Sequence, residues 1–498
     1  MQYQPLNIVY KFEHQQLKMT NNQTAAFKPT LGLFDATMIV AGSMIGSGIF
    51  IVSADITRNV GSAGWLILVW VLTGFMTLVA ALSYGELCGM FPRAGGQYIY
   101  LKEAYNPLVG FLYGWSFFTV IQTATIAAVG VAFSKFLAYL VPQLGNNYFL
   151  FDVLGLKIYA GQLVAIAIIC FLTFVNTKGV KEAKWIQRLF TSAKLLALFG
   201  LIICGFFLVK ESFWNANMQT SFKAMQNFGE KDATGILHTK DWIGIGGSAL
   251  AGAIAAAMVG SIFSSDAWNN VTFIAGEMKN AKRNLGLSLL LGTLIVTVIY
   301  VAANLMYLNV MPLQELAFPT DDRVAVAAAN KIFPAFGTTL IAVCIMISTF
   351  GCNNGLILAG ARVYYTMAKD GLFFKQVGQL NKFDVPQVAL WIQCIAASLW
   401  CLSGKYGDLL DMISFVVVMF YMLTIAGIFI LRKKQPNTER PYKAFGYPIL
   451  PIIYILMGLA FCILLVIYKP NYTWPGLIIT LAGIPVYYLI IGNKKTII

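Results

Sequence analysis

The feature that most limits how this chain can fold is a series of long apolar segments separated by short polar ones. An α-helix needs about 20 apolar residues to cross the hydrocarbon core of a membrane, with a range of about 17 to 25. Because lipid offers the backbone no hydrogen-bond partners, apolar segments of this length predict helices. We therefore expect an all-α polytopic membrane protein with twelve transmembrane helices. The segments are residues 31–58, 64–91, 107–141, 160–176, 186–209, 246–277, 285–311, 336–366, 387–403, 409–431, 447–468 and 473–492.

Composition and charge agree with a membrane protein and argue against one that binds nucleic acid. Hydrophobic residues make up 58% of the chain and charged residues only 11%, which is too apolar for a soluble globular domain. The formal net charge is +14, but the positive residues lie between the apolar segments and mostly on the side of the N terminus. Such positive residues mark the cytoplasmic side. We expect an inner-membrane protein in contact with the lipid bilayer, with both termini in the cytoplasm and no nucleic acid bound.

Three glycines interrupt the first segment. Gly42, Gly46 and Gly48 fall within seven positions, and glycine is a poor helix former, although small residues can also serve only to let two helices pack closely. A break leaves backbone N–H and C=O groups unpaired, which is tolerated in a membrane only where the backbone faces protein or a water-filled cavity. The half-helix after the break then offers N–H groups to a carboxylate, and the half before it offers carbonyls to an ammonium. A zwitterion fits this arrangement.

The sixth segment contains a second polar interruption. Residues 259–270 place Asp266 and Asn269 at mid-membrane depth, where polar side chains are costly unless they line a cavity. The tripeptide at 260–262 also repeats the glycine-serine-apolar pattern at 42–44. Segments one and six are the first members of two halves of five segments each, and because five is odd, the halves lie inverted in the membrane. Matching interruptions in two inverted halves predict a binding site at the midplane.

This organisation divides the chain into five regions. Two repeats of five helices are separated by the longest outer loop, and two further helices follow the second repeat. The regions are a cytoplasmic N-terminal tail at 1–30, the first repeat at 31–210, an extracytoplasmic loop at 211–245, the second repeat at 246–431, and two last helices with a short C-terminal tail at 432–498.

Three polar features lie outside the two interruptions. Residues 91–106 are amphipathic and could form an interfacial helix or a plain linker. The polar patch at 348–355 in the eighth segment could line a path or provide helix contacts of small residues. Glu86 and Glu277 lie at the inner ends of their segments, where we expect solvation at the membrane interface.

The interruptions occur among short motifs that are specific in combination. These are Gly46-Ser47-Gly48-Ile49-Phe50, Gly85-Glu86-Leu87, Phe91-Pro92-Arg93-Ala94-Gly95-Gly96-Gln97-Tyr98, Trp268-Asn269, Glu277-Met278-Lys279-Asn280, and Arg362 through Asp370-Gly371. Together they resemble the amino acid-polyamine-organocation superfamily over roughly residues 28–470, and within it the bacterial members of the L-type amino acid transporter branch. The resemblance implies a LeuT-like fold of two inverted five-helix repeats with discontinuous helices 1 and 6, alternating access, and an L-amino acid substrate.

The resemblance also implies a binding site formed at both interruptions. The substrate carboxylate would meet the backbone N–H groups of Ser47, Gly48 and Ile49, and Phe263 would close over the bound substrate. The carbonyl groups expected to meet the ammonium are those of Met44, Ile45, Phe263 and Asp266. The complete expected substrate site is Met44, Ile45, Gly46, Ser47, Gly48, Ile49, Phe263, Ser264, Asp266 and Asn269.

Lys194 lies near the cytoplasmic end of the fifth segment. One interpretation is a lysine that extends its ammonium to the membrane surface. The surrounding residues, 187–194, instead resemble the family segment whose lysine reaches the broken first helix and takes the place of a sodium ion. The resemblance therefore implies a coupling role for Lys194 and transport that does not depend on sodium.

Two departures from the family pattern bear on substrate and partner. Asp266 and Ala267 stand where the family usually has glycines, and some relatives that accept dibasic amino acids carry an aspartate at the first of these positions. Asp266 could cap the following half-helix, pair with a cationic substrate side chain, or take up a proton. Human members join a heavy chain through a cysteine between spans three and four, but residues 142–159 contain none, so we expect no disulfide-linked partner.

These observations predict a secondary transporter of L-amino acids that works by sodium-independent exchange or proton-coupled uptake. Alternatives are a carrier of cationic amino acids or polyamines and a channel. An enzyme is not expected, because neither histidine lies in a predicted span and no H-E-x-x-H motif is present. A pump driven by ATP is disfavoured by the absence of a G-x-x-x-x-G-K-[ST] motif. We expect no cofactor and no metal.

Overall fold

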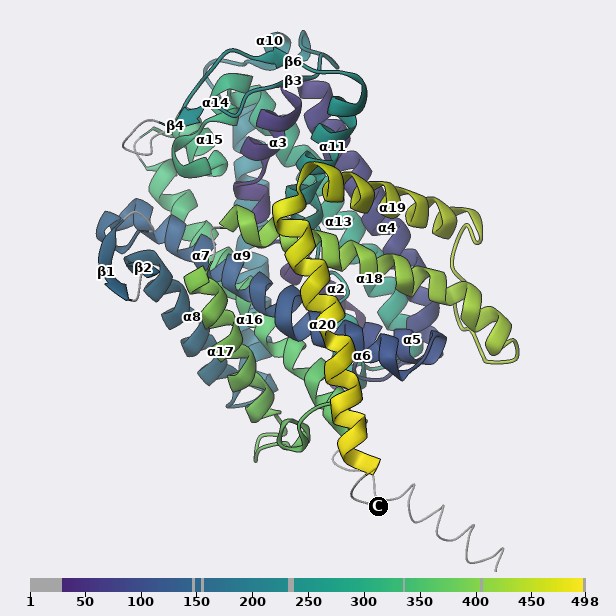
Figure 1. The fold of residues 1–498 in the computed structure, drawn as a ribbon. Helices are drawn as coiled ribbons and strands as arrows, with labels where there is room; N and C mark the ends of the chain where they lie inside the picture. The colour runs from purple at the N-terminus through teal and green to yellow at the C-terminus, as the bar shows by residue number, and fades with distance from the viewer. Residues whose placement is uncertain are drawn as a thin grey trace, which may run out of the picture.

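The computed structural model describes residues 29–145, 148–153, 156–231, 237–334, 336–403 and 406–495, and these residues are mostly helical (Figure 1). Residues 1–28 of the expected tail lie outside the described ranges. The main helices are α2 (Leu33–Met44), α3 (Ser53–Val60), α4 (Ala63–Met90), α5 (Gln97–Ala104), α6 (Pro107–Ser116), α7 (Gln122–Leu140), α8 (Ala160–Asn176), α9 (Val180–Phe207), α10 (Trp214–Met218), α11 (Gly247–Ser264), α12 (Asn270–Phe273), α13 (Ala281–Val310), α14 (Leu313–Ala317), α15 (Val324–Ile332), α16 (Gly337–Lys369), α17 (Gln387–Ser403), α18 (Tyr406–Lys434), α19 (Ile449–Tyr468) and α20 (Pro470–Lys495).

Short elements complete the structure. Three antiparallel pairs of strands form between β1 and β2, β3 and β6, and β4 and β5. The strands are β1 (Phe149–Val153), β2 (Leu156–Tyr159), β3 (Met225–Gln226), β4 (Glu230–Lys231), β5 (Leu237–His238) and β6 (Ile243–Gly244). The short helical turns are η1 (Gly48–Phe50), η2 (Phe117–Ile121), η3 (Pro142–Leu144), η4 (Ala275–Glu277), η5 (Thr320–Asp322) and η6 (Lys375–Gly378).

Eight helices in the described ranges are long and apolar enough to cross a membrane. They are Ala63–Met90, Pro107–Leu140, Leu189–Phe207, Gly247–Ser264, Ala281–Val310, Gly337–Lys369, Tyr406–Lys434 and Ile449–Tyr468. Shorter apolar helices are Leu33–Met44, Ala160–Asn176, Gln387–Leu402 and Thr473–Leu489. Every apolar segment of the sequence therefore coincides with a helix or an interrupted helix, and the chain is a multi-pass membrane protein. Length and composition alone support eight spans, and the expected count of twelve stays a prediction.

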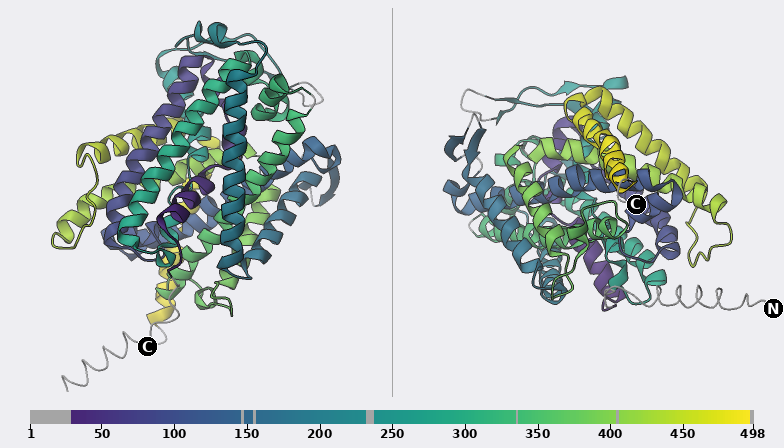
Figure 2. Two further views of the ribbon diagram at one scale, coloured as in Figure 1. Left: turned by 180° about the vertical axis from the view of Figure 1, so that it is seen from behind. Right: turned by 60° about the horizontal axis from the view of Figure 1, so that its bottom comes forward.

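Both interrupted segments lie inside the bundle. In the first, α2 ends at Met44, and helical structure resumes only at η1 and then α3. In the sixth, α11 ends at Ser264, and α12 begins at Asn270. Around them, α13 packs along α2 and α4, while α16 packs along α7 and α9. Figures 1 and 2 show α10 and the short strands β3, β4 and β6 gathered over one end, called the upper end below, with the C-terminal end of α20 at the opposite, lower end.

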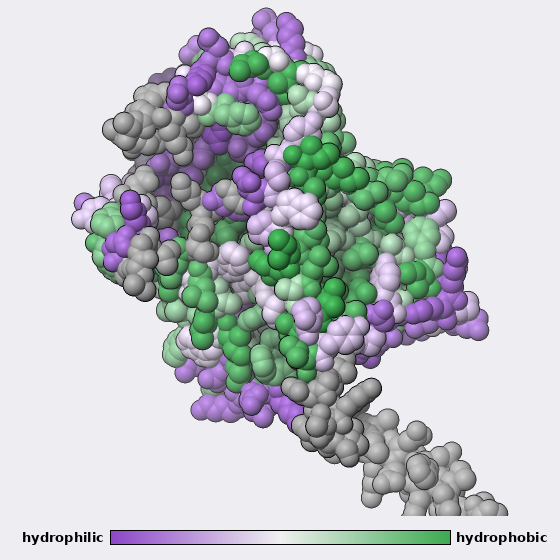
Figure 3. Space-filling view, in the orientation of Figure 1, coloured by the Kyte–Doolittle hydropathy of each residue, from purple (hydrophilic) through white to green (hydrophobic). Residues whose placement is uncertain are grey.

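The outside of the bundle is strongly apolar. Large hydrophobic side chains are exposed on α9, α17 and α20, for example Leu196 at 73%, Ile395 at 62% and Ile478 at 61%. Figure 3 shows hydrophobic residues over the middle of the visible face and hydrophilic residues concentrated toward its ends. A continuous apolar surface of this extent is unfavourable in water. It is the surface expected of helices that face lipid.

The two glutamates expected to be solvated at the membrane interface are buried instead, at 0% exposure for Glu86 and 3% for Glu277. Glu86 accepts hydrogen bonds from Arg432 at 3.0 and 2.7 Å, and Glu277 accepts from Arg362 at 3.3 and 3.2 Å. The expectation was wrong because a buried carboxylate is stabilised by an arginine partner rather than by water. The first pair links α4 to α18, and the second links η4 to α16.

The amphipathic stretch at 91–106 contains a helix, α5, and one side of this helix is packed into the protein. Gln97, Tyr98, Leu101 and Ala104 are buried on it, and it packs against α6 and α18. The polar side chain of Gln97, at the start of α5, therefore lies inside the protein. The structure confirms the helix, and its location at the membrane interface stays a prediction.

Candidate functional site

The two interruptions meet inside the bundle, where η1 packs against the end of α11. A Cβ atom added to Gly48 would lie 1.9 Å from the Oγ atom and 3.0 Å from the Cα atom of Ser264. Such a separation leaves no space for any side chain at position 48. Glycine is required here for close backbone approach, so the sequence pattern reflects both a helix break and tight packing.

Backbone N–H groups are left unpaired after the first break. Those of Ser47, Gly48 and Ile49 make no hydrogen bond to any residue that the structure describes. They belong to the start of a helical segment, where the first N–H groups have no intrahelical partner. The arrangement can bind an anionic group such as a carboxylate.

Two aromatic side chains cover this region beside Ser47. The hydroxyl groups of Tyr406 and Ser47 form a hydrogen bond of 3.0 Å. The ring of Tyr406 meets the ring of Phe263 edge to face, with 6.1 Å between the ring centroids. Phe263 is thus placed beside the first break, and its closing over a bound substrate stays a prediction. Tyr406 gave no signal in the sequence, because it is one aromatic residue at the start of an apolar helix.

The carbonyl groups at the breaks already have protein partners. The hydroxyl group of Tyr300, on α13, is 3.0 Å from the carbonyl oxygens of both Met44 and Ser264. Tyr300 therefore bridges the ends of the two interrupted helices. For the Met44 carbonyl to bind a substrate ammonium, as expected from the sequence, the hydroxyl group of Tyr300 would have to share this oxygen or move away from it.

Lys194 reaches the first break. Its Nζ atom donates hydrogen bonds to the carbonyl oxygens of Gly42 and Ile45, the second at 2.7 Å, and the residue is 1% exposed. The alternative in which its ammonium extends to the membrane surface is therefore wrong. The ammonium instead stabilises carbonyl groups that the end of α2 leaves without helical partners.

The polar patch of α16 contacts the same break. The hydroxyl group of Ser348 lies 3.3 Å from the carbonyl oxygens of both Ile45 and Gly46. The thiol of Cys352 donates to the carbonyl oxygen of Ser43 at 3.2 Å. The patch thus provides specific polar contacts to carbonyl groups at the end of α2.

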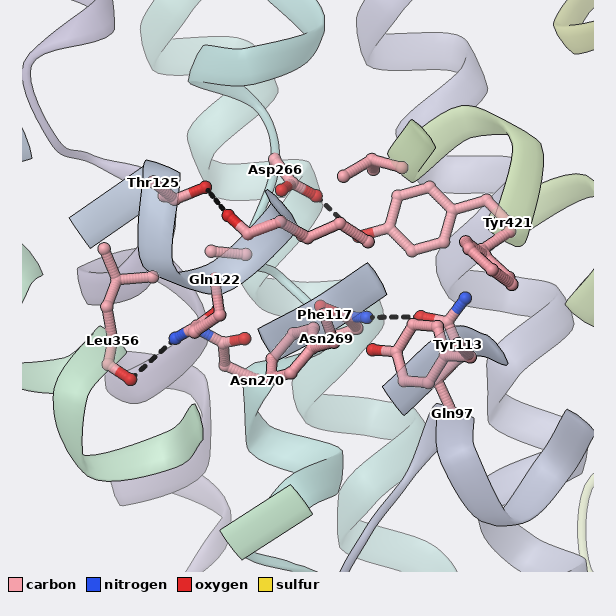
Figure 4. Close-up of a pocket in the computed structure, with 14 residues that line it drawn as sticks. Gln97, Tyr113, Phe117, Gln122, Thr125, Asp266, Asn269, Asn270, Leu356 and Tyr421 are labelled. Carbon is pink, nitrogen blue, oxygen red and sulfur yellow. Dashed lines mark hydrogen bonds between the residues drawn. The ribbon is translucent and has the colours of Figure 1, made fainter. Parts of the chain in front are cut away.

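A small cavity lies next to the second break (Figure 4). Its volume is about 10 Å³, roughly the space of one water molecule. Among the expected site residues, only Asp266 and Asn269 line it, whereas 44–49, Phe263 and Ser264 do not. The structure therefore separates the expected site into a closely packed backbone region and a polar cavity beside it. The cavity lining is Gln97, Tyr113, Phe117, Ile121, Gln122, Thr125, Asp266, Ala267, Asn269, Asn270, Leu356, Val417, Phe420 and Tyr421.

Asp266 is buried at the edge of this cavity and is held by Tyr421. The hydroxyl group of Tyr421 donates to Oδ1 of Asp266 at 2.5 Å. Helix α12 begins four residues later, with Asn269 at its N-cap position and no side-chain cap, so Asp266 does not cap α12. Ala267 has φ +62°, a left-handed conformation that costs a non-glycine residue about 1–2 kcal/mol. The usual glycine at this position would avoid that cost.

Two polar atoms in the cavity lining lack a partner among the described residues. They are Nδ2 of Asn270 and the hydroxyl oxygen of Tyr113, and both residues are 2% exposed. Buried polar groups are normally hydrogen-bonded. The cavity can therefore accept a group that pairs with them, and neither residue had been expected from sequence to take part.

Comparisons with known proteins identify the family of this chain. Residues 31–491 match the family model described as amino acid permease. The chain is 31% identical to the human large neutral amino acids transporter small subunit 2 over 93% of this chain and 81% of that protein. It is 28% identical to the mouse b(0,+)-type amino acid transporter 1, over 95% and 90%, and to the mouse Asc-type amino acid transporter 1, over 94% and 82%. The chain belongs to the amino acid permease family, a family of transporters and not of enzymes.

Proposed function

We propose that this protein is a secondary transporter of L-amino acids that works by alternating access. The observation that carries the proposal is the meeting of two interrupted helices, with unpaired N–H groups on one side of the first break and carbonyl groups on the other. This arrangement complements the two charged ends of an amino acid. The relatives are amino acid transporters by name, which supports the same substrate class.

The proposed architecture has twelve membrane spans, of which the first ten form two inverted repeats of five helices. It is supported by the coincidence of each apolar segment with a helix and by the interruption of the first helix of each half. The distribution of positive residues supports a cytoplasmic position for both termini in the inner membrane.

The proposed substrate site uses the N–H groups of 47–49 for the carboxylate and the carbonyls near the two breaks for the ammonium. The substrate side chain would then face the polar cavity lined by Asp266 and Asn269. Because Gly48 and Ser264 are in contact and the cavity has the volume of one water molecule, binding requires η1 and α11 to move apart. Such relative movement around a central site is the basis of alternating access.

A neutral amino acid is the leading substrate, and a cationic amino acid or polyamine is the alternative. The first is supported by the names of the large neutral and Asc-type relatives. The second is supported by the carboxylate of Asp266 at the cavity. Its bond to Tyr421 favours the first, because a cationic side chain would have to share the carboxylate with the tyrosine.

Uptake into proteoliposomes with a panel of amino acids inside and outside tests the function directly. We expect saturable uptake of a labelled L-amino acid, and its acceleration by an unlabelled amino acid on the opposite side if the protein exchanges substrates. A transmembrane pH gradient separates proton-coupled uptake from exchange. Single conductance events without counterflow would indicate a channel and contradict the proposal.

Replacing Asp266 by asparagine distinguishes the roles of this carboxylate. The variant keeps a hydrogen-bond acceptor for Tyr421 but has no charge and cannot titrate. For a neutral-substrate carrier, we expect uptake to change no more than about fivefold, because a neutral hydrogen bond replaces a charged one at a cost of about 1 kcal/mol.

The same proteoliposome panel supplies the outcomes that would change this assignment. Selective loss of lysine or arginine uptake would assign Asp266 to recognition of a cationic side chain. Loss of the pH-driven component for every substrate would assign it to proton coupling. Asp408→Asn is a matched control, because Asp408 lies at the start of α18 and outside the cavity.

A further inference from the structure

The side chain of Gln97, the first residue of α5, connects the cavity to α18. Its Oε1 atom accepts a hydrogen bond from Nδ2 of Asn269 at 3.0 Å, and its Nε2 atom donates to the hydroxyl oxygen of Thr424 at 3.0 Å. Figure 4 shows the bond between Gln97 and Asn269 at the lower side of the cavity. All three residues are buried, with exposures of 1% to 4%.

Glycines allow α5 to approach the second break this closely. Gly95 and Gly96 have φ values of +107° and +43°, which residues other than glycine adopt only with strain. A Cβ atom on Gly96 would lie 2.1 Å from Oγ1 of Thr272, on α12. The turn therefore fixes the start of α5 directly against the segment that follows the break.

Two further side chains of the same helix are also anchored. Asp370, which follows α16, accepts hydrogen bonds from the hydroxyl group of Tyr98 at 2.7 Å and from Nζ of Lys102 at 2.6 Å. Because α5 is fixed both by its glycine turn and by these contacts, its first side chain has a defined position. Gln97 is thus held by a rigid element.

The direction of the hydrogen bonds determines which way the amides point. The hydroxyl group of Thr424 has one hydrogen, and it donates this hydrogen to the carbonyl oxygen of Phe420 at 2.8 Å. Its oxygen can then only accept from Gln97, so Gln97 must direct its NH₂ group toward Thr424 and its carbonyl toward Asn269. Asn269 must in turn direct its NH₂ group toward Gln97, which leaves its own carbonyl oxygen for other partners.

We propose that Gln97 is a positioning residue that sets the orientation of the Asn269 amide at the cavity and thereby determines which substrate side chains are preferred. The inference rests on the proposed function, because it needs Asn269 to face the substrate side chain. Without the bond from Gln97, the Asn269 amide can rotate and present a donor where it now presents an acceptor.

The test replaces Gln97 by methionine, which has a similar length and makes neither hydrogen bond. We expect apparent affinities for amino acids with polar side chains to fall about fivefold to tenfold, the effect of one buried hydrogen bond with an unsatisfied partner. Affinities for apolar amino acids should change less, and the maximal rate of uptake should change least. Thr424→Val should shift the preference in the same direction by a smaller factor, because it removes only the group that directs the Gln97 amide.

Gln393→Met is the matched control. Gln393 is an equally buried glutamine on α17, which donates to the carbonyl oxygen of Ile357 at 3.1 Å and does not line the cavity. The Gln393→Met variant should leave the order of substrate preference unchanged, although it removes a buried amide as Gln97→Met does. The melting temperature of each purified variant reports general loosening of the fold separately.

Asn269→Ala separates failure of the inference from failure of the proposed site. If Asn269 and Gln97 act as one unit, the double variant should lose no more affinity than Asn269→Ala alone. If Asn269→Ala changes the substrate preference but Gln97→Met does not, the positioning role is overturned while the site stands. If Asn269→Ala changes no affinity at all, the proposed site itself is wrong. An equal loss for all substrates in Gln97→Met would also contradict the inference, because it indicates only general destabilisation.

Discussion

Replacing Gly48 by leucine should abolish amino acid binding, and replacing it by alanine should weaken binding about tenfold to hundredfold. The first side-chain atom at this position would overlap Oγ of Ser264, at 1.9 Å, and would press on its Cα atom, at 3.0 Å. Overpacking of this kind costs about 1–3 kcal/mol, and the strain falls on the N–H groups that we assign to the carboxylate. Scintillation proximity binding or ligand-induced thermal shift of the purified protein measures the effect.

Two further variants make this prediction specific: a compensating change at Ser264 and a control substitution at another helical glycine. Ser264→Gly removes the two closest atoms and should partly restore binding to Gly48→Ala. Gly200→Ala, on α9, should have no effect on binding, since an added Cβ atom there meets nothing within 4 Å, and it should slightly favour the helix. Unchanged affinity in Gly48→Leu would rule out this placement of the site.

The interruptions of the first and sixth helices could be predicted because their causes are local. Three glycines in seven positions weaken a helix wherever it is placed, and an aspartate with neighbouring asparagines in an apolar segment indicates a polar lining. The contacts that hold the breaks together could not be predicted in this way. Tyr300 bridges Met44 and Ser264, yet in the sequence it is one tyrosine inside an apolar helix.

The two buried glutamates show why a charged residue at the end of an apolar segment does not reveal its surroundings. Glu86 and its partner Arg432 are 346 positions apart in the chain, and Glu277 and Arg362 are 85 apart. A carboxylate near the membrane surface can be stabilised by water or by a distant arginine, and one sequence does not distinguish the two. The burial of both glutamates followed only from how the helices pack.

The division of the site also depends on packing. The sequence placed 44–49, Asp266 and Asn269 in one substrate site, whereas in the structure only the last two line the cavity. The remaining lining comes largely from the third apolar segment, which forms α6, η2 and α7, from α18, and from Gln97 on α5. These residues are far apart in sequence, and no local pattern indicates that they converge.

Replacing Lys194 by alanine should reduce the rate of transport more than tenfold and weaken substrate binding much less. The ammonium donates hydrogen bonds to the carbonyl oxygens of Gly42 and Ile45, and hydrogen bonds to charged groups contribute about 1.5–3 kcal/mol each. The initial rate of uptake and the equilibrium binding of the same purified variant give the two effects separately. Lys331→Ala is the control, because Lys331 forms an exposed ion pair with Glu315, which contributes little.

The difference between the two effects follows from which end of the break Lys194 contacts. The proposed carboxylate ligands are N–H groups after the break, and Lys194 bonds only to carbonyls before it, so its removal leaves the carboxylate ligands in place. The substitution does remove the positive charge at the negative end of α2. In the closed arrangement, the Gly42 carbonyl then loses its ammonium partner, and the Ile45 carbonyl keeps only the longer contact to Ser348. The interconversion of conformations should therefore slow. Because an ammonium already neutralises these carbonyls, transport by the unmodified protein should be the same in sodium and in choline, and strict sodium dependence would contradict this role.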